Sequence, residues 1–96
     1  MTVEAALVEL RIPGSGSLKD KRRVVRGLID AARRRFGASV AEVGDLDLLR
    51  RAEIGIAVVS GSPAHAEAEM DAVLRWIEER PDLEVAGVSR ETIQLR

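Results

Sequence analysis

The residues whose types and spacing allow chemistry lie between positions 12 and 36, where a Gly/Ser turn precedes the densest positive charge of the chain. More than half of the 15 Lys+Arg fall here: Lys19, Lys21, Arg22, Arg23, Arg26, Arg33, Arg34 and Arg35. Only Asp20 and Asp30 oppose them, so a strongly basic segment lies inside a chain of net charge −1. Such charge separation favours contact with a polyanion or an acidic surface.

The turn before this segment is a candidate small-anion site. Gly14, Ser15, Gly16 and Ser17 lead into a predicted helix N-terminus, where free amides and the helix dipole favour anions. Lys21 could add charge there, or its stem could lie along the edge of the core. The GxxxxGK[ST] phosphate-binding pattern is absent, and an ordinary turn explains the same residues.

The helix that follows has an apolar stripe and an opposing basic face. At 100° per residue the stripe contains Leu18, Val25, Leu28, Ile29, Ala32 and Phe36. The basic face contains Lys19, Arg23, Arg26, Arg33 and Arg34. Charged helix faces are commonly only solvated. Here, however, the second predicted helix, from 63 to 80, is mainly acidic. This segregation makes the basic face a candidate surface for nucleic acid or a protein partner.

The remaining elements predict where these surfaces lie. Strands are expected at 3–12, 38–43 and 52–60, and a final strand is expected from 83–88 and 91–95, with Gly87 at a bulge or bend. Residues 46–49 are compatible with one helical turn. The order strand, helix, strand, strand, helix, strand predicts one α+β domain over residues 1–96. It is a ferredoxin-like βαββαβ sandwich with two helices on one face of a four-stranded antiparallel sheet. Leu7, Gly55, Ala57 and Val59 then lie on the uncovered face, which favours a homodimer or a protein partner.

Composition excludes several kinds of site. The chain has no Cys and one His, so we predict no metal, no cofactor and no catalytic residue. The two aromatic residues, Phe36 and Trp76, fall at helix positions, which argues against stacking of bases on the sheet. The amino-terminal residues lack a basic and apolar leader pattern, so a cytoplasmic location is expected.

The run from Ile12 to Ser15 and the run from Ser17 to Val25 resemble the opening signature of the YlxP-like family of small bacterial proteins of unknown function. Residues 39–43 and 57–60 resemble its second and third strands. The resemblance implies a ferredoxin-like fold and a gene often found beside translation genes. It supports a non-enzymatic domain that contacts ribosomal RNA or a translation factor. A homodimeric regulatory domain that binds a small anion is the alternative, and an enzyme acting on a phosphorylated substrate is the third.

Overall fold

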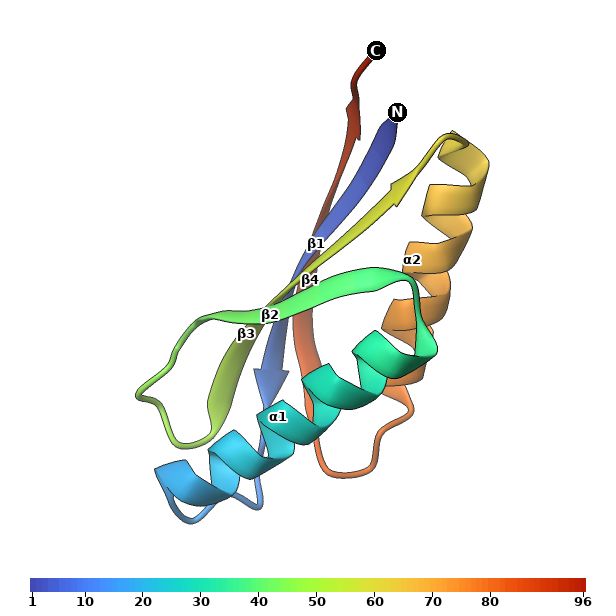
Figure 1. Cartoon of the computed structure of the whole chain (residues 1–96). Coiled ribbons are helices and arrows are strands. Elements are labelled where there is room, and N and C mark those ends of the chain that lie inside the picture. Colours follow the sequence, from blue (N-terminus) through green and yellow to red (C-terminus); the bar gives the residue numbers. More distant parts are fainter.

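The computed structural model describes residues 1–96 and contains six elements in the predicted order (Figure 1). They are β1 (Thr2–Arg11), α1 (Leu18–Arg35), β2 (Ala38–Gly44), β3 (Arg51–Ser60), α2 (Pro63–Glu78) and β4 (Glu84–Gln94). The chain folds as an α+β sandwich.

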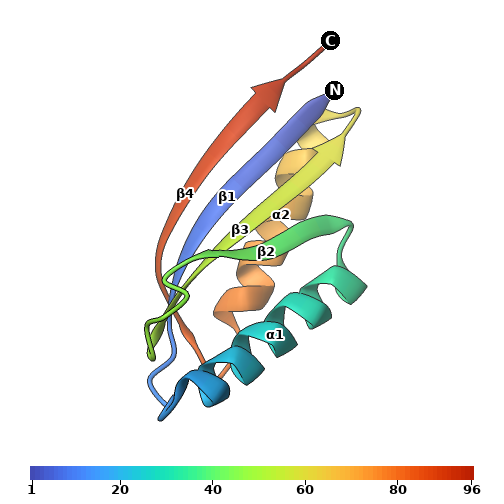
Figure 2. The same ribbon diagram turned by 60° about the vertical axis from the view of Figure 1, so that its left-hand side comes forward.

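The sheet has the strand order β2-β3-β1-β4, and every neighbouring pair is antiparallel. Both helices lie on one face of it, and the chain termini lie at the same end (Figures 1 and 2). The predicted ferredoxin-like topology is therefore confirmed. The strand β3 lies between β2 and β1 and is therefore an interior strand, which agrees with its largely apolar sequence. The other face of the sheet is left without helices.

Alternation along the strands builds the core. In β1 the residues Ala6, Val8 and Leu10 are buried, while Leu7, Glu9 and Arg11 are exposed. The even-numbered positions of β3 from Ala52 to Val58 are buried in the same way, and α2 adds Met70, Val73 and Ile77. Seventeen buried apolar residues form one cluster between the helices and the sheet.

Both helices begin at a serine whose hydroxyl caps the first turn. The Ser17 hydroxyl accepts a hydrogen bond from the amide of Asp20 (3.1 Å), and Ser62 accepts one from the amide of His65 (3.3 Å). Pro63 stands at the start of α2, where its missing N–H costs nothing. The Ser17 cap fixes the residue at which α1 begins, and the Ser62 cap does the same for α2.

Two local features refine the sequence expectations. The bulge in β4 falls at Ala86, because Glu9 pairs with Gly87 and Leu10 pairs with Val85. The helical turn expected at 46–49 is wrong. Asp45 adopts φ 58° and its carbonyl accepts from the amide of Leu48 (3.1 Å), so this loop is a tight turn. Its leucines Leu46, Leu48 and Leu49 are exposed.

Candidate functional site: the outer face of helix α1

The outer face of α1 carries a dense group of exposed cations. Lys19, Arg23, Arg26 and Arg34 lie there as predicted. Arg23 has one long ion pair with Asp20, at 3.9 Å between exposed groups, and the other three have none. Exposed pairs of this kind are worth less than about 1 kcal/mol. The charge on this face is therefore available to a ligand.

Arg22 joins the face, although the predicted binding set left it out. It lines a shallow depression of about 650 Å³ with Lys19, Arg23, Arg26, Gly27 and Asp30. It also lines a second groove of about 480 Å³ between α1 and β2, with Arg26 and Arg33. Helical periodicity places Arg22 beside the apolar stripe rather than opposite it, which is why the predicted basic face did not include this residue.

Gly27 is the second residue that the sequence analysis missed. It lies in the middle of an 18-residue helix, where glycine is about 1 kcal/mol less favourable than alanine. A Cβ at this position would meet no atom within 4 Å, so core packing does not require glycine. The absent side chain instead leaves the helix backbone open among Arg23, Arg26 and Asp30.

Two predicted site residues have structural partners instead. The guanidinium of Arg33 donates to the carbonyl of Val40 (2.6 Å) and so joins α1 to β2. Lys21 is fully buried, and its ammonium lies 3.2 Å from Glu42 Oε2 and donates to the carbonyl of Asp45 (2.5 Å). The prediction that Lys21 supplies charge to the Gly/Ser loop is therefore wrong, as is the expectation that only its stem is buried.

The Gly/Ser loop lies beside carboxylates rather than cations. A cleft of about 450 Å³ is lined by Gly14 and Ser15 from the loop and by Asp20, Asp82 and Glu84, with Arg23 as its one cation. Ser15 is buried, and its hydroxyl has no hydrogen-bond partner. With Lys21 withdrawn, the loop amides between Gly14 and Ser17 lack the compensating charge that an anion site needs.

The aromatic rings are already in contact with other groups. Phe36 and Trp76 pack edge to face with centroids 5.6 Å apart. Arg35 lies over Phe36 at 5.7 Å, and Arg80 lies over Trp76 at 5.0 Å. Neither ring belongs to the uncovered face of the sheet. A nucleic acid on this protein would thus be held by its backbone rather than by stacking of bases.

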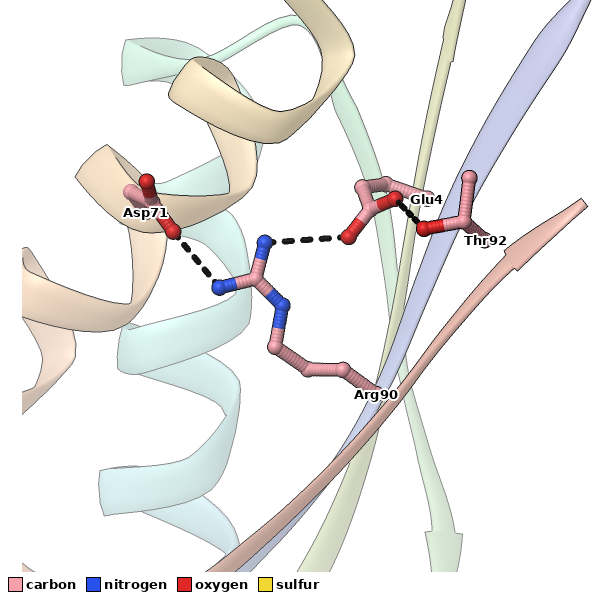
Figure 3. Close-up of polar contacts among 4 residues, drawn as sticks. All are labelled: Glu4, Asp71, Arg90 and Thr92. Atoms are coloured by element: carbon pink, nitrogen blue, oxygen red, sulfur yellow. Dashed lines mark hydrogen bonds and ion pairs between the residues drawn. The ribbon is translucent and has the colours of Figure 1, made fainter. Parts of the chain in front are cut away.

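A second polar cluster ties α2 to the sheet (Figure 3). Arg90 lies 3.0 Å from Glu4 Oε1 and 2.6 Å from Asp71 Oδ1, and the hydroxyl of Thr92 donates to the other oxygen of Glu4. The hydrogen bond from Thr92, reinforced by Arg90, holds the pKa of the Glu4 carboxyl below its ordinary value despite burial.

The sequence contained a sign of this cluster. Glu4 falls on the inward register of β1 with Ala6 and Val8, where a charge requires partners. Each of the four side chains is hydrogen-bonded to at least one other member of the cluster. We therefore assign it a structural role, the attachment of α2 to the edge strand β4.

The uncovered face of the sheet contains the predicted interface residues together. Leu7 and Gly55 are direct cross-strand partners, as are Ala5 and Ala57. Val59 is 60% exposed, and Ile93 and Val43 are exposed beside this group. The side chain of Val43 lies against Gly55, where a Cβ would come within 3.0 Å of it. The predicted apolar patch therefore exists, and it is larger than expected.

Two further observations concern metal ligands and membrane-spanning helices. No group of three or more His, Asp or Glu side chains is placed to hold a metal ion. No helix combines the length and apolar character needed to cross a membrane.

Comparison with known proteins places the chain in a family. Residues 3–90 match the family described as "Protein of unknown function (DUF503)". The chain belongs to this family. It is 37% identical over 76 residues to the "Uncharacterized protein YlxP" of Bacillus subtilis (strain 168). The aligned residues make up 79% of this chain and 83% of that protein. The resemblance to YlxP-like proteins is thereby confirmed.

The fold also has a structural relative. The de novo designed protein LFR1 1 with ferredoxin fold matches 99% of this chain and 87% of its own length, with a TM-score of 0.51 and 16% sequence identity. At this identity the likeness concerns the fold alone. The description of the DUF503 family names no activity, so the surface residues of this chain are what bears on its function.

Proposed function

We propose that this protein is a non-enzymatic RNA-binding domain that holds the phosphate backbone of structured RNA on the outer face of α1. The observation that carries the proposal is Gly27, a helix-weakening residue that packing does not require, placed among exposed cations of which only Arg23 has an ion pair, a long one with Asp20. A glycine on a basic helix lets phosphates approach the helix backbone more closely than any side chain would allow.

The spacing of the cations supports a backbone ligand. Lys19, Arg23, Arg26 and Arg34 extend over about 22 Å of helix, at about 1.5 Å per residue. That length spans several successive phosphates along one strand. Asp30 lies in the same face and makes no ion pair, so it moderates the attraction without cancelling it.

The recognition we propose is independent of base sequence. Phosphate contacts position a protein on a nucleic acid but carry no base information. The uncovered sheet face has no aromatic residue on which bases could stack, and Phe36 and Trp76 contact each other and two arginines. A ribosomal RNA helix is the partner that fits this chemistry and the YlxP-like resemblance.

Fluorescence anisotropy with a labelled RNA duplex tests this proposal. Four cations in contact with phosphates should give a slope of about −3 to −4 for log K against log[salt]. A single strand of the same length should bind less tightly, because no stacking platform holds its bases. A slope near zero, or binding of an acidic polypeptide in preference to the duplex, would refute it.

A further inference from the structure

The two edges of the sheet differ in how far they are closed to another strand. The strand order makes β2 and β4 the edge strands. In β2 the carbonyl of Val40 accepts from the guanidinium of Arg33 (2.6 Å), and a bulge at Val43 interrupts the strand. Such features hinder the addition of a further strand. The strand β4 contains no proline or lysine, and its one irregularity is the bulge at Ala86, near its start.

The hydrogen-bond ladder shows which backbone groups of β4 are free. The N–H of Leu95 donates to the carbonyl of Met1 (2.8 Å), and the amino group of Met1 donates to the carbonyl of Leu95 (2.5 Å). Because such pairs recur at every second residue of an antiparallel ladder, the odd-numbered residues from Gly87 to Ile93 also bond to β1. The even-numbered residues therefore turn their N–H and carbonyl groups to the open edge: Val88, Arg90, Thr92 and Gln94.

The side chains of this segment leave the open edge accessible. Arg90 and Thr92 are hydrogen-bonded to Glu4 and Asp71, so both are held over the sheet by groups of the same copy (Figure 3). Ile93 is 41% exposed. The strand β4 is therefore regular beyond its bulge, has free backbone groups and carries an exposed apolar side chain. An edge of this kind is a template for another strand.

We propose that β4 pairs antiparallel with β4 of a second copy, with a twofold axis perpendicular to the sheet at Thr92. The two sheets then form one continuous sheet, with the helices of both copies on the same face. Thr92 faces Thr92 of the second copy, Arg90 faces Gln94, and Glu91 faces Ile93. Each relationship is reciprocal, as an isologous interface requires.

Charge excludes two of the neighbouring registers. An axis at Arg90 would place this residue directly opposite Arg90 of the second copy, and an axis at Glu91 would do the same for that carboxylate. Like charges directly opposite each other destabilise a sheet. With the axis at Thr92, no residue of the paired segment faces a like charge, and the central pair is two threonines, which is a favourable cross-strand pair.

The length of regular strand excludes the registers on either side. An axis at Ser89 would bring the bulge at Ala86 into the paired segment, opposite Thr92 of the second copy. An axis at Ile93 would leave only residues 91–95 to pair. The axis at Thr92 pairs residues 89–95, which are free of the bulge and extend over about 24 Å.

This segment supports a weak dimer. Arg90, Thr92 and Gln94 would exchange about six backbone hydrogen bonds with the same residues of the second copy. The exposed side chains of Ile93 and Leu95 would lie against the partner strand and lose contact with water. Because a single pair of strands buries less surface than a permanent interface does, we expect a dimer Kd on the order of 100 μM.

The dimer does not rest on the RNA proposal. The helix α1 packs beside β2, through the contacts of Lys21 with Glu42 and of Arg33 with Val40, at the edge of the sheet opposite β4 (Figure 2). The outer face of α1 therefore stays exposed in the dimer. Loss of the dimer and loss of RNA binding can be measured separately.

Single-cysteine variants test the register, since the native chain has no cysteine. Glu91→Cys and Ile93→Cys place thiols at residues that face each other across the axis, with Cα atoms about 4.5 Å apart. Each of these residues lies about 8 Å from its own counterpart, which is too far for a disulfide. Under mild oxidation the mixture should therefore form a disulfide-linked heterodimer at least about 10-fold faster than either variant forms a homodimer. Faster formation of either homodimer would overturn the register.

Sedimentation velocity on proline variants tests the open edge. We expect the wild-type chain to be mostly dimeric at about 500 μM. Gln94→Pro removes a free N–H within the paired segment and should raise the dimer Kd at least about 10-fold. The matched control Val88→Pro removes an equally free N–H outside that segment and should leave the Kd unchanged. Circular dichroism melting establishes that each variant is folded. A monomeric wild type, or the same Kd for both folded proline variants, would overturn the inference.

Discussion

The ammonium of Lys21 lies 3.2 Å from Oε2 of Glu42, and the Lys21 side chain has no exposed surface. Lys21 also donates to the carbonyls of Asp45 (2.5 Å) and Leu46 (3.4 Å). One side chain thus joins α1 to β2 and to the turn that follows it. It fixes the rotation of α1 about its axis, and therefore which residues that helix presents outward.

Loss of one member of this pair should be strongly destabilising. Lys21→Met leaves Glu42 without its partner and the Asp45 carbonyl without its donor, so we expect the free energy of unfolding to fall by about 3 kcal/mol or more. Lys21→Met/Glu42→Leu removes both charges and should recover much of that loss. Urea denaturation of the two variants measures this. Equal stabilities for the single and double variants would show that the pair is not coupled.

The Glu4 cluster predicts a pH dependence of stability. Because the folded state lowers the pKa of Glu4 from its ordinary 4.5, the stabilisation is fully present above pH 4.5 and is lost as the pH falls through the lowered value. Glu4→Gln should lower the free energy of unfolding by about 1–3 kcal/mol at pH 7. It should also flatten its decline in acid. Denaturant titrations of both proteins from pH 7 to pH 3 compare the slopes. Parallel pH profiles would contradict the assignment.

Reversal of the outer charges should remove RNA binding without unfolding the domain. Arg23, Arg26 and Arg34 are exposed, so their replacement by Glu should leave the melting temperature nearly unchanged. It should weaken duplex RNA binding by at least about 100-fold and flatten the salt slope by about 3. The control is reversal of Arg50, Arg75 and Arg96, which are also exposed and change net charge equally. Equal losses in both triple variants would mean that net charge alone governs binding.

Gly27→Ala separates stability from function. Alanine should raise the free energy of unfolding by about 0.5–1 kcal/mol, because it favours the helix and meets no atom. The added methyl group should weaken RNA binding by about 3- to 10-fold. Gly37→Ala, beyond the end of α1 and equally free of contacts, should leave the affinity unchanged. Unchanged or tighter RNA binding by Gly27→Ala would argue that the glycine has no role in it.

The sequence predicts the fold well because alternation and capping are local patterns. The inward positions of β1, the stripe of α1 and the caps at Ser17 and Ser62 all follow from residue spacing. The predicted basic face is also present, since helical periodicity places its residues together. What could not be predicted is the pairing of charges across elements. Lys21 reaches Glu42 only because β2 packs beside α1.

Like-charged neighbours across β1 and β3 were missed for a related reason: Glu9 pairs with Glu53, and Arg11 pairs with Arg51. Glu9 and Glu53 are far apart in the sequence, and the register of β1 against β3 alone makes them neighbours. A one-residue shift of that register would turn one of them into the core. Cross-strand relationships of this kind depend on turn geometry, which the spacing of apolar residues leaves open.

Amide NMR during titration with a short RNA duplex tests the central claim most directly. We expect the largest chemical-shift changes at residues 19–34, with Gly27 among them because its backbone is exposed beside the cations. Small changes should occur on α2 and on the uncovered sheet face. Changes centred on the sheet, on α2 or on the 13–17 loop, with α1 unaffected, would contradict the account.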